Sequence, residues 1–219
     1  MNFASLYFSP WIFSVIFSVF FNGESEPEWN LTKEDEGIKI YTRYIEGSEI
    51  RAFKAVAIME GKLSEFVSVF KDVENFPELF DSNKLATILE QNDTIQWYYS
   101  VTAVPWPLKD RDGIYCFHFK QNYQNKIVTI KVVADPDRMP ENDGIVRIRK
   151  AEGTWTLEPM DINKVRVTLE MHGEPGGSIP DWIANMFVVD SPIKDFKNLR
   201  ERIALDQYKN KKYDFLVEY

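Results

Sequence analysis

Residues 173–203 read GEPGGSIPDWIANMFVVDSPIKDFKNLRERI, and this stretch decides the fold of the chain. Its large apolar side chains recur at steps of three and four residues, the spacing of one side of a helix. They are Trp182, Met186, Val189, Ile193, Phe196, Leu199 and Ile203. Pro192 removes a backbone donor within this pattern, so the stretch predicts either one bent helix or two abutting helices over residues 180–190 and 192–205. A helix with this much apolar surface needs a broad concave surface to cover.

The sequence before this helix is typical of an antiparallel sheet. Residues 38–45 and 50–59 flank the turn Glu46-Gly47-Ser48 and predict a hairpin, while helical spacing over residues 63–73 predicts a short helix ending near Phe76-Pro77. Further strands are expected at residues 85–90, 94–104, 113–123, 127–134 and 145–160, the last with a potential break at Gly153. Apolar and polar residues alternate strictly from Lys164 to His172, which predicts a strand with one covered face. This order of elements is an α+β pattern.

The composition supports one folded domain that does not bind nucleic acid. The chain has 219 residues, of which 44% are hydrophobic, enough for one sizeable core. Its net charge of -8 argues against nucleic acid as a partner, because phosphate contacts rely on clustered Lys and Arg. Arg147, Arg149 and Lys150 could meet an anionic head group or a membrane surface, but their alternation with apolar residues is more typical of a solvated strand face.

The N-terminus is an apolar segment of the kind that targets a protein to a membrane. Residues 3–21 carry no charge and would extend about 28 Å as a helix at roughly 1.5 Å per residue. Gly23-Glu24-Ser25 offers a cleavage pattern, so residues 1–25 are predicted to be a signal peptide. The protein is then extracytoplasmic, periplasmic or secreted; the alternative is a membrane anchor formed by residues 3–21. The domain would occupy residues 26–206, followed by a C-terminal tail at residues 207–219.

Local signatures of catalysis are missing from the sequence. It contains no HExxH, CxxC, P-loop or GxGxxG motif, so no metal, cofactor or catalytic residue is expected. Cys116 is the only cysteine, which excludes an internal disulfide. Cys116 and His118 would share one face of a strand, but this spacing is common by chance and favours packing roles over nucleophilic chemistry.

Several ordered segments resemble one known family. They are Trp29-Asn-Leu, Gly37-Ile-Lys-Ile-Tyr-Thr-Arg43, Phe53-Lys-Ala-Val, Phe70-Lys-Asp-Val73, Val104-Pro-Trp-Pro-Leu-Lys-Asp-Arg-Asp112 and Glu174-Pro-Gly-Gly-Ser-Ile-Pro-Asp-Trp182. Together they resemble the START lipid-transfer domains, and in particular the short bacterial-type members of the helix-grip (Bet v 1-like) superfamily. The resemblance covers about residues 28–205.

The resemblance implies an α+β helix-grip fold, in which a curved antiparallel sheet wraps around a long C-terminal helix and encloses a hydrophobic cavity. The helix and its neighbouring loops would act as a lid. The residues expected to bind the ligand are Trp97, Tyr99, Val101, Phe117, Trp182, Met186 and Val189. Sterol-binding members carry a buried acid and base, whereas the matching positions here read Tyr98 and Phe117, which argues against a sterol ligand.

The function implied is the non-catalytic binding and transfer of a lipid or other hydrophobic molecule, with transient membrane contact. No cofactor is implied. An alternative is an enzyme similar to the polyketide cyclases and aromatases of the same superfamily, acting in the same cavity. A third possibility is a purely structural or protein-interaction domain, which would have no cavity.

Overall fold

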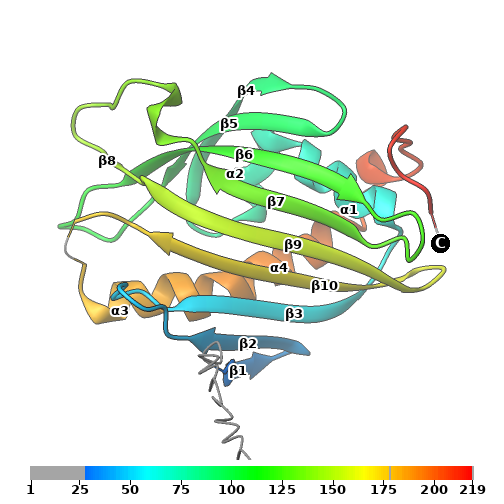
Figure 1. Ribbon diagram of the computed structural model, residues 1–219, viewed down its shortest axis with the longest axis horizontal. Coiled ribbons are helices and arrows are strands. Elements are labelled where there is room, and N and C mark those ends of the chain that lie inside the picture. The colour runs from blue at the N-terminus through cyan, green and yellow to red at the C-terminus, as the bar shows by residue number, and fades with distance from the viewer. Residues whose placement is uncertain (1–27, 178, 219) are drawn as a thin grey trace, which may run out of the picture.

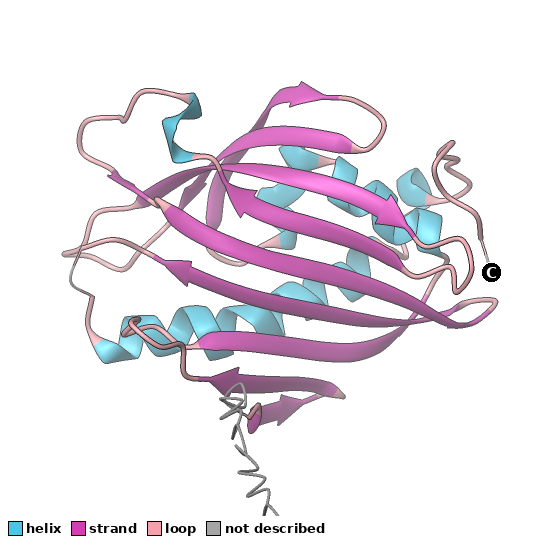
Figure 2. Cartoon of the chain, in the orientation of Figure 1, coloured by secondary structure: helices cyan, strands magenta, loops and turns pink. Residues whose placement is uncertain are grey.

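The computed structural model describes residues 28–177 and 179–218, and it shows one curved sheet with helices on its concave side (Figure 1). The leader predicted at residues 1–25 lies outside the described residues. Colouring by secondary structure shows the longer helices gathered on one side of the strands, with one short helical turn, Pro136–Arg138, lying apart from them at the upper left (Figure 2). In the described residues, no helix is long and apolar enough to span a membrane.

The sheet consists of ten strands within the described residues. They are β1 (Asn30–Asp35), β2 (Ile38–Arg43), β3 (Ala52–Glu60), β4 (Asn83–Gln91), β5 (Ile95–Thr102), β6 (Arg111–Gln121), β7 (Val128–Ala134), β8 (Val146–Arg147), β9 (Lys150–Asp161) and β10 (Lys164–Glu174). Nine of them follow the spatial order β1-β2-β3-β10-β9-β7-β6-β5-β4 with antiparallel pairing throughout, and β8 pairs in parallel with β6. The α+β class and the helix-grip arrangement are therefore as predicted.

Two local expectations differ from the structure. The strand expected over residues 145–160 is divided into β8 and β9 at residues 148–149, and β9 runs without a break through Gly153. At that position a Cβ atom would lie 2.6 Å from the carbonyl oxygen of Glu170, so the glycine allows close strand packing rather than a break. The helix α1 (Leu63–Lys71) ends at Lys71, before the expected end near Phe76-Pro77, and a 3-10 turn over Val73–Asn75 follows it. A further short helix, α2 (Phe76–Leu79), begins at the Phe76-Pro77 step because proline is compatible with a first helical turn.

The C-terminal helix runs along the concave side of the sheet in three continuous parts (Figure 1, orange). They are α3 (Asp181–Asn185), the π-helical turn η3 (Met186–Asp190) and α4 (Ser191–Arg202). Pro192 lies in the first turn of α4, where its missing donor is tolerated. In the π-helical turn each hydrogen bond spans five residues instead of four, and the buried side chains accordingly step by five from Ile183 to Val188.

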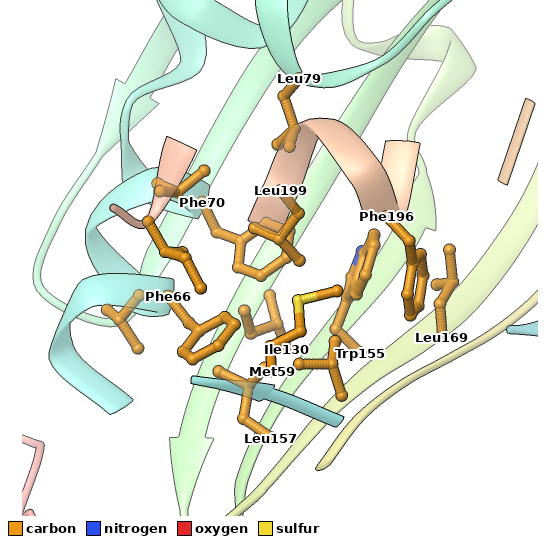
Figure 3. Packing of buried hydrophobic residues seen from close by; sticks show 14 of the residues in the cluster. Met59, Phe66, Phe70, Leu79, Ile130, Trp155, Leu157, Leu169, Phe196 and Leu199 are labelled. Atoms are coloured by element: carbon orange, nitrogen blue, oxygen red, sulfur yellow. The ribbon is translucent and has the colours of Figure 1, made fainter. Parts of the chain in front are cut away.

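One end of the space between sheet and helix is filled by a close-packed core (Figure 3). Side chains from strands, α1 and α4 meet there, among them Met59, Phe66, Phe70, Ile130, Leu157 and Leu199. The ring of Trp155 stacks on Phe196 at 5.5 Å between centroids and lies 4.6 Å from the ring of Phe70. This aromatic group closes the packed end of the domain.

The C-terminal segment packs against α1, where Figure 1 draws it in red. The Glu218 carboxylate accepts hydrogen bonds from the backbone nitrogens of Leu63 at 3.1 Å and Ser64 at 2.9 Å, two donors that the first turn of a helix leaves unpaired. The Tyr213 hydroxyl also donates to Ser68 Oγ at 2.9 Å. Residues beyond α4 therefore stabilise the start of α1.

Candidate functional site

A cavity of about 260 Å³ lies between the sheet and the C-terminal helix, beyond the aromatic group that closes the packed end. Apolar and aromatic side chains from six strands form much of its wall, including Phe53, Tyr98, Phe117, Val132, Trp155 and Leu169. The helix contributes Ala184, Phe187, Val188, Ser191, Pro192 and Asp195. A concave, mainly apolar site with a few polar groups is the usual form of a small-molecule site.

The aromatic wall of the cavity is built from alternate residues of neighbouring strands. Tyr98 on β5 and Phe117 on β6 point to the same face, and their rings meet edge to face at 5.0 Å between centroids. Phe76 of α2 contacts the Tyr98 ring at 5.1 Å with an interplanar angle of 90°. These contacts hold the wall rigid because each ring is packed on more than one side.

Asn83, Ser100, Ser191 and Asp195 form what we call the polar end of the cavity. Asn83 Nδ2 donates to Ser100 Oγ at 2.6 Å. Asp195 Oδ1 accepts a hydrogen bond from the backbone nitrogen of Asp81 at 2.8 Å. Ser191 lies one helical turn before Asp195, on the same side of α4. Polar groups therefore gather at one part of an otherwise apolar wall.

Asp195 has an unusual protonation equilibrium for a carboxylic acid. Burial raises its pKa to about 8, and the nearby Asp81 carboxylate adds to the shift, while the hydrogen bond from the Asp81 backbone and the charge of Lys194 oppose it. The residue is half-buried and borders the cavity. At neutral pH Asp195 is therefore mainly a neutral group that can donate as well as accept a hydrogen bond.

The glycine-rich segment before α3 is tied to the sheet at the edge of the cavity. The Arg111 guanidinium donates to the carbonyl oxygens of Lys109, Pro175 and Gly176 at 2.6, 3.2 and 3.1 Å. Gly176 and Gly177 have φ values of +72° and +65°, which favour glycine. Arg111 thus fixes the point from which the C-terminal helix leaves the sheet.

Asp112 next to Arg111 points to the other side of β6, where it forms a buried ion pair with Arg147. Their side chains are each 1% exposed, and two hydrogen bonds of 2.9 and 3.0 Å join them. Burial pushes the pKa of Asp112 upward, but hydrogen bonds from Arg147, Asn142 and Tyr99 outweigh it and hold this pKa below its usual value. The pair anchors the loop between β7 and β8 over the convex face of β5 and β6, because Arg147 also donates to carbonyl oxygens of that loop.

Of the strand residues expected to bind a ligand, the structure places Phe117 on the cavity wall. Trp97, Tyr99 and Val101 lie outside the wall, and Tyr98 and Ser100, one residue out of phase with them, point into the cavity. The Arg138 guanidinium lies over the Trp97 ring at 4.3 Å on the other face. Successive side chains of a strand point to opposite faces, so an error in choosing the inner face of β5 changes every residue expected from that strand.

The three helix residues expected to form the roof of the cavity also lie outside its wall. Trp182 is 59% exposed, and neither Met186 nor Val189 belongs to the cavity wall. The expected residues belong to the apolar stripe that continues into the buried Ile193 and Phe196, whereas the neighbouring side of the helix, with Ala184, Val188 and Pro192, borders the cavity.

Sequence reasoning missed the polar end of the cavity altogether. Ser191 and Asp195 are four residues apart, a spacing that places them on one side of a helix, and this was the available signal. Cys116 is half-buried, and burial raises the pKa of its thiol, while His118 is exposed on the convex face of β6. In the described residues, no group of three or more His, Cys, Asp or Glu could hold a metal ion.

The fold and the cavity define the class of protein, a helix-grip domain with a mainly apolar cavity between its sheet and its C-terminal helix. The model of the START domain family matches residues 21–209. The chain therefore belongs to the START domain family.

Similar proteins agree with this assignment. A Pseudomonas aeruginosa protein, PA1579, is 31% identical over 187 residues, which cover 85% of this chain and 92% of that protein. The phosphatidylcholine transfer protein of Mus musculus is 23% identical over 163 residues, covering 72% of this chain and 75% of the relative.

A crystal structure of a STAR-related lipid transfer protein from Xanthomonas axonopodis has a TM-score of 0.75 and 38% identity. The matched region covers 81% of this chain and 99% of the Xanthomonas axonopodis chain. The human StAR-related lipid transfer protein 5 shares the fold with a TM-score of 0.68 at 18% identity, covering 80% and 86% of the two chains.

Proposed function

We propose that this protein binds one hydrophobic molecule, a lipid or a similar compound, in the cavity beneath the C-terminal helix and carries it without changing it chemically. The observation that carries the proposal is the cavity of about 260 Å³ in a chain of the START family, walled mainly by apolar and aromatic side chains. Enclosing about 200 Å² of apolar ligand surface would contribute roughly 5 kcal/mol before the costs of binding.

Transfer requires the ligand to enter and leave the cavity. The C-terminal helix and its neighbouring loops would act as the lid that opens for this step. The wall on that side is formed by α3, η3 and the first turn of α4, joined to β10 by the glycine-rich segment. Movement of these elements would open the cavity while leaving the packed end intact. Transient contact with a membrane is part of the proposal, because a lipid would otherwise cross water.

The proposal is tested by extracting purified protein with organic solvent and by native mass spectrometry. We expect one small hydrophobic molecule per chain, and transfer of that molecule between donor and acceptor vesicles in the presence of the protein. Protein that takes up no hydrophobic compound from vesicles or from solution would refute the proposal.

An enzyme acting in the same cavity is a second candidate, favoured by one observation. Asp195 offers a carboxyl group with a pKa of about 8 inside the cavity, and general acid or base catalysis uses such groups. The two candidates differ in the fate of the ligand. Under the carrier proposal a bound compound is recovered with unchanged mass after long incubation, whereas a new mass that is absent with Asp195→Asn would favour the enzyme.

We also propose that the protein acts outside the cytoplasm, as its N-terminal sequence predicts. The intact mass of the native protein would show whether residues 1–25 are removed, and cell fractionation would show where the mature chain is found. An intact leader in a membrane fraction would favour the anchored alternative instead.

A further inference from the structure

Two buried polar atoms at the polar end of the cavity have no hydrogen-bond partner within the described residues. They are Ser191 Oγ, on a residue that is 7% exposed, and Asn83 Oδ1. Both residues belong to the cavity wall. Buried polar atoms in folded proteins are nearly always paired, so two unpaired atoms on residues of one cavity wall point to a polar group that arrives with the ligand.

The unpaired atoms and Asp195 belong to one site. Asp195 follows Ser191 by one turn of α4, and its Oδ1 is 2.8 Å from the backbone nitrogen of Asp81. Asp81 is two residues before Asn83 in the chain, and the Asn83 amide is oriented by its bond of 2.6 Å to Ser100 Oγ. Segments far apart in sequence thus bring an amide, a hydroxyl and a carboxyl group to the same part of the wall.

The charged side chains around Asp195 are already engaged. Asp81 and Lys194, the two ionic groups that act on it, pair with each other at 3.0 Å. Elsewhere on the wall, Arg111 donates to three carbonyl oxygens and Arg51 donates to the Tyr44 hydroxyl.

The other titratable groups of the wall add no free positive charge. Glu174 pairs with Lys150 at 3.3 Å, and burial raises the pKa values of Tyr98 and Tyr115, so both phenols are neutral. An anionic head group at the polar end would lie beside the Asp195 carboxyl group, where the nearby Asp81 carboxylate already disfavours a further negative charge. A cationic head group would be desolvated in surroundings that already disfavour the charged form of Asp195.

We propose that the polar end of the cavity binds an uncharged hydroxyl or amide group of the ligand through Asn83, Ser191 and Asp195. The ligand must carry a hydrogen-bond donor, because Asn83 Oδ1 can only accept in this orientation. This proposal rests on the proposed function and adds the chemical class of the ligand: a neutral lipid or related compound with a terminal alcohol or amide.

The first test compares compounds that share a dodecyl chain and differ in the end group. Dodecan-1-ol and lauramide are expected to bind more tightly at pH 7 than methyl laurate, which accepts hydrogen bonds but cannot donate one. They should also exceed laurate, dodecylamine and dodecylphosphocholine, whose end groups are charged. Affinities are measured by displacement of N-phenyl-1-naphthylamine and checked by native mass spectrometry.

The second test uses variants of the polar end. Ser191→Ala is expected to lower the affinity for dodecan-1-ol by about threefold to tenfold, the usual effect of one hydrogen bond. The affinity for methyl laurate should stay unchanged. Asp195→Asn keeps a neutral donor and acceptor and removes only the ability to ionise, so it isolates the effect of the carboxylate charge. Glu201→Gln makes the same acid-to-amide change on an exposed part of α4 and serves as the matched control.

The third test is pH. Binding of a neutral ligand that excludes water from Asp195 requires the neutral carboxyl group, so affinity for dodecan-1-ol should fall by up to about tenfold between pH 7 and pH 9. The Asp195→Asn variant should show no such fall, and Glu201→Gln should behave as the wild type. This readout separates a direct role of Asp195 from a general effect on folding.

The outcomes distinguish the two proposals. If methyl laurate or a charged compound binds as tightly as dodecan-1-ol, or if Ser191→Ala weakens all compounds equally, the end-group proposal is refuted while the carrier function stands. If no compound of the series binds to the wild-type protein, the proposed function itself fails.

Discussion

Filling the cavity from the helix side should weaken binding without weakening the fold. Ala184 of α3 lies on the wall of the cavity, and Ala184→Leu places three more carbon atoms there. If these displace about three methylene groups of the ligand, at about 0.8 kcal/mol each, the loss is about 2.4 kcal/mol, or roughly fiftyfold in affinity. The thermal midpoint of unfolding should stay the same or rise, because the added side chain fills a hollow.

The assay is titration with N-phenyl-1-naphthylamine together with thermal unfolding of the same preparations. Asn185→Leu adds a leucine at the next residue, which is exposed and does not line the cavity, and should bind as the wild type does. Wild-type affinity in Ala184→Leu would refute the assignment of the cavity as the binding site. Equal losses in both variants would point to a general effect of apolar substitution on the helix.

Three further predictions concern stability. Glu218→Ala should lower the free energy of unfolding by about 1–2 kcal/mol in urea denaturation, because it removes the acceptor for two donors at the start of α1; an unchanged value would show that this contact contributes nothing. Asp112→Asn should cost about 3–5 kcal/mol by leaving Arg147 buried without its partner, whereas the exposed Asp137→Asn should change stability little. For Asp195, the folded pKa of about 8 exceeds the ordinary 3.8, so its neutral form stabilises the fold at low pH and this contribution is lost between about pH 4 and 8. Asp195→Asn should therefore gain stability relative to wild type as pH rises through this window, and parallel pH profiles of the two proteins would contradict that reasoning.

The order of strands and helices was largely predictable because periodicity reports which segments cover a core. The edge strand β1 was not found, since its sequence NLTKED is charged and mostly exposed and it pairs only with β2. A strand with so little buried surface leaves no alternating pattern to detect.

The site was less predictable for a related reason. On β5 aromatic residues occupy both faces, with Trp97 and Tyr99 outside and Tyr98 inside, so hydrophobicity does not select the inner face. The outer face is covered by the loop after β7, where Asn142 donates to the Tyr99 hydroxyl and Arg138 lies over Trp97. Only the three-dimensional position of this loop explains why both faces are apolar.

The helix shows a second limit of periodicity. Its stripe of large apolar residues marks the side that packs into the core, and Phe196, Leu199 and Ile203 are buried as the pattern predicted. The side that borders the cavity lies next to this stripe and carries smaller and polar residues, among them Ala184, Ser191 and Asp195. The error is therefore confined to the part of the helix that faces the cavity.

The late position of α4 and of the segment that ends at Glu218 sets the order in which the domain can be completed. All ten strands precede residue 175, yet the helix that covers their concave face and the carboxylate that binds α1 come from residues 191–218. During synthesis only the short helices α1 and α2 can cover the apolar face of the sheet until residues 191–218 have emerged. Folding should therefore be completed only after residues 191–218 have emerged, and nascent chains that stop before residue 191 should bind chaperones and be cleaved readily by proteases.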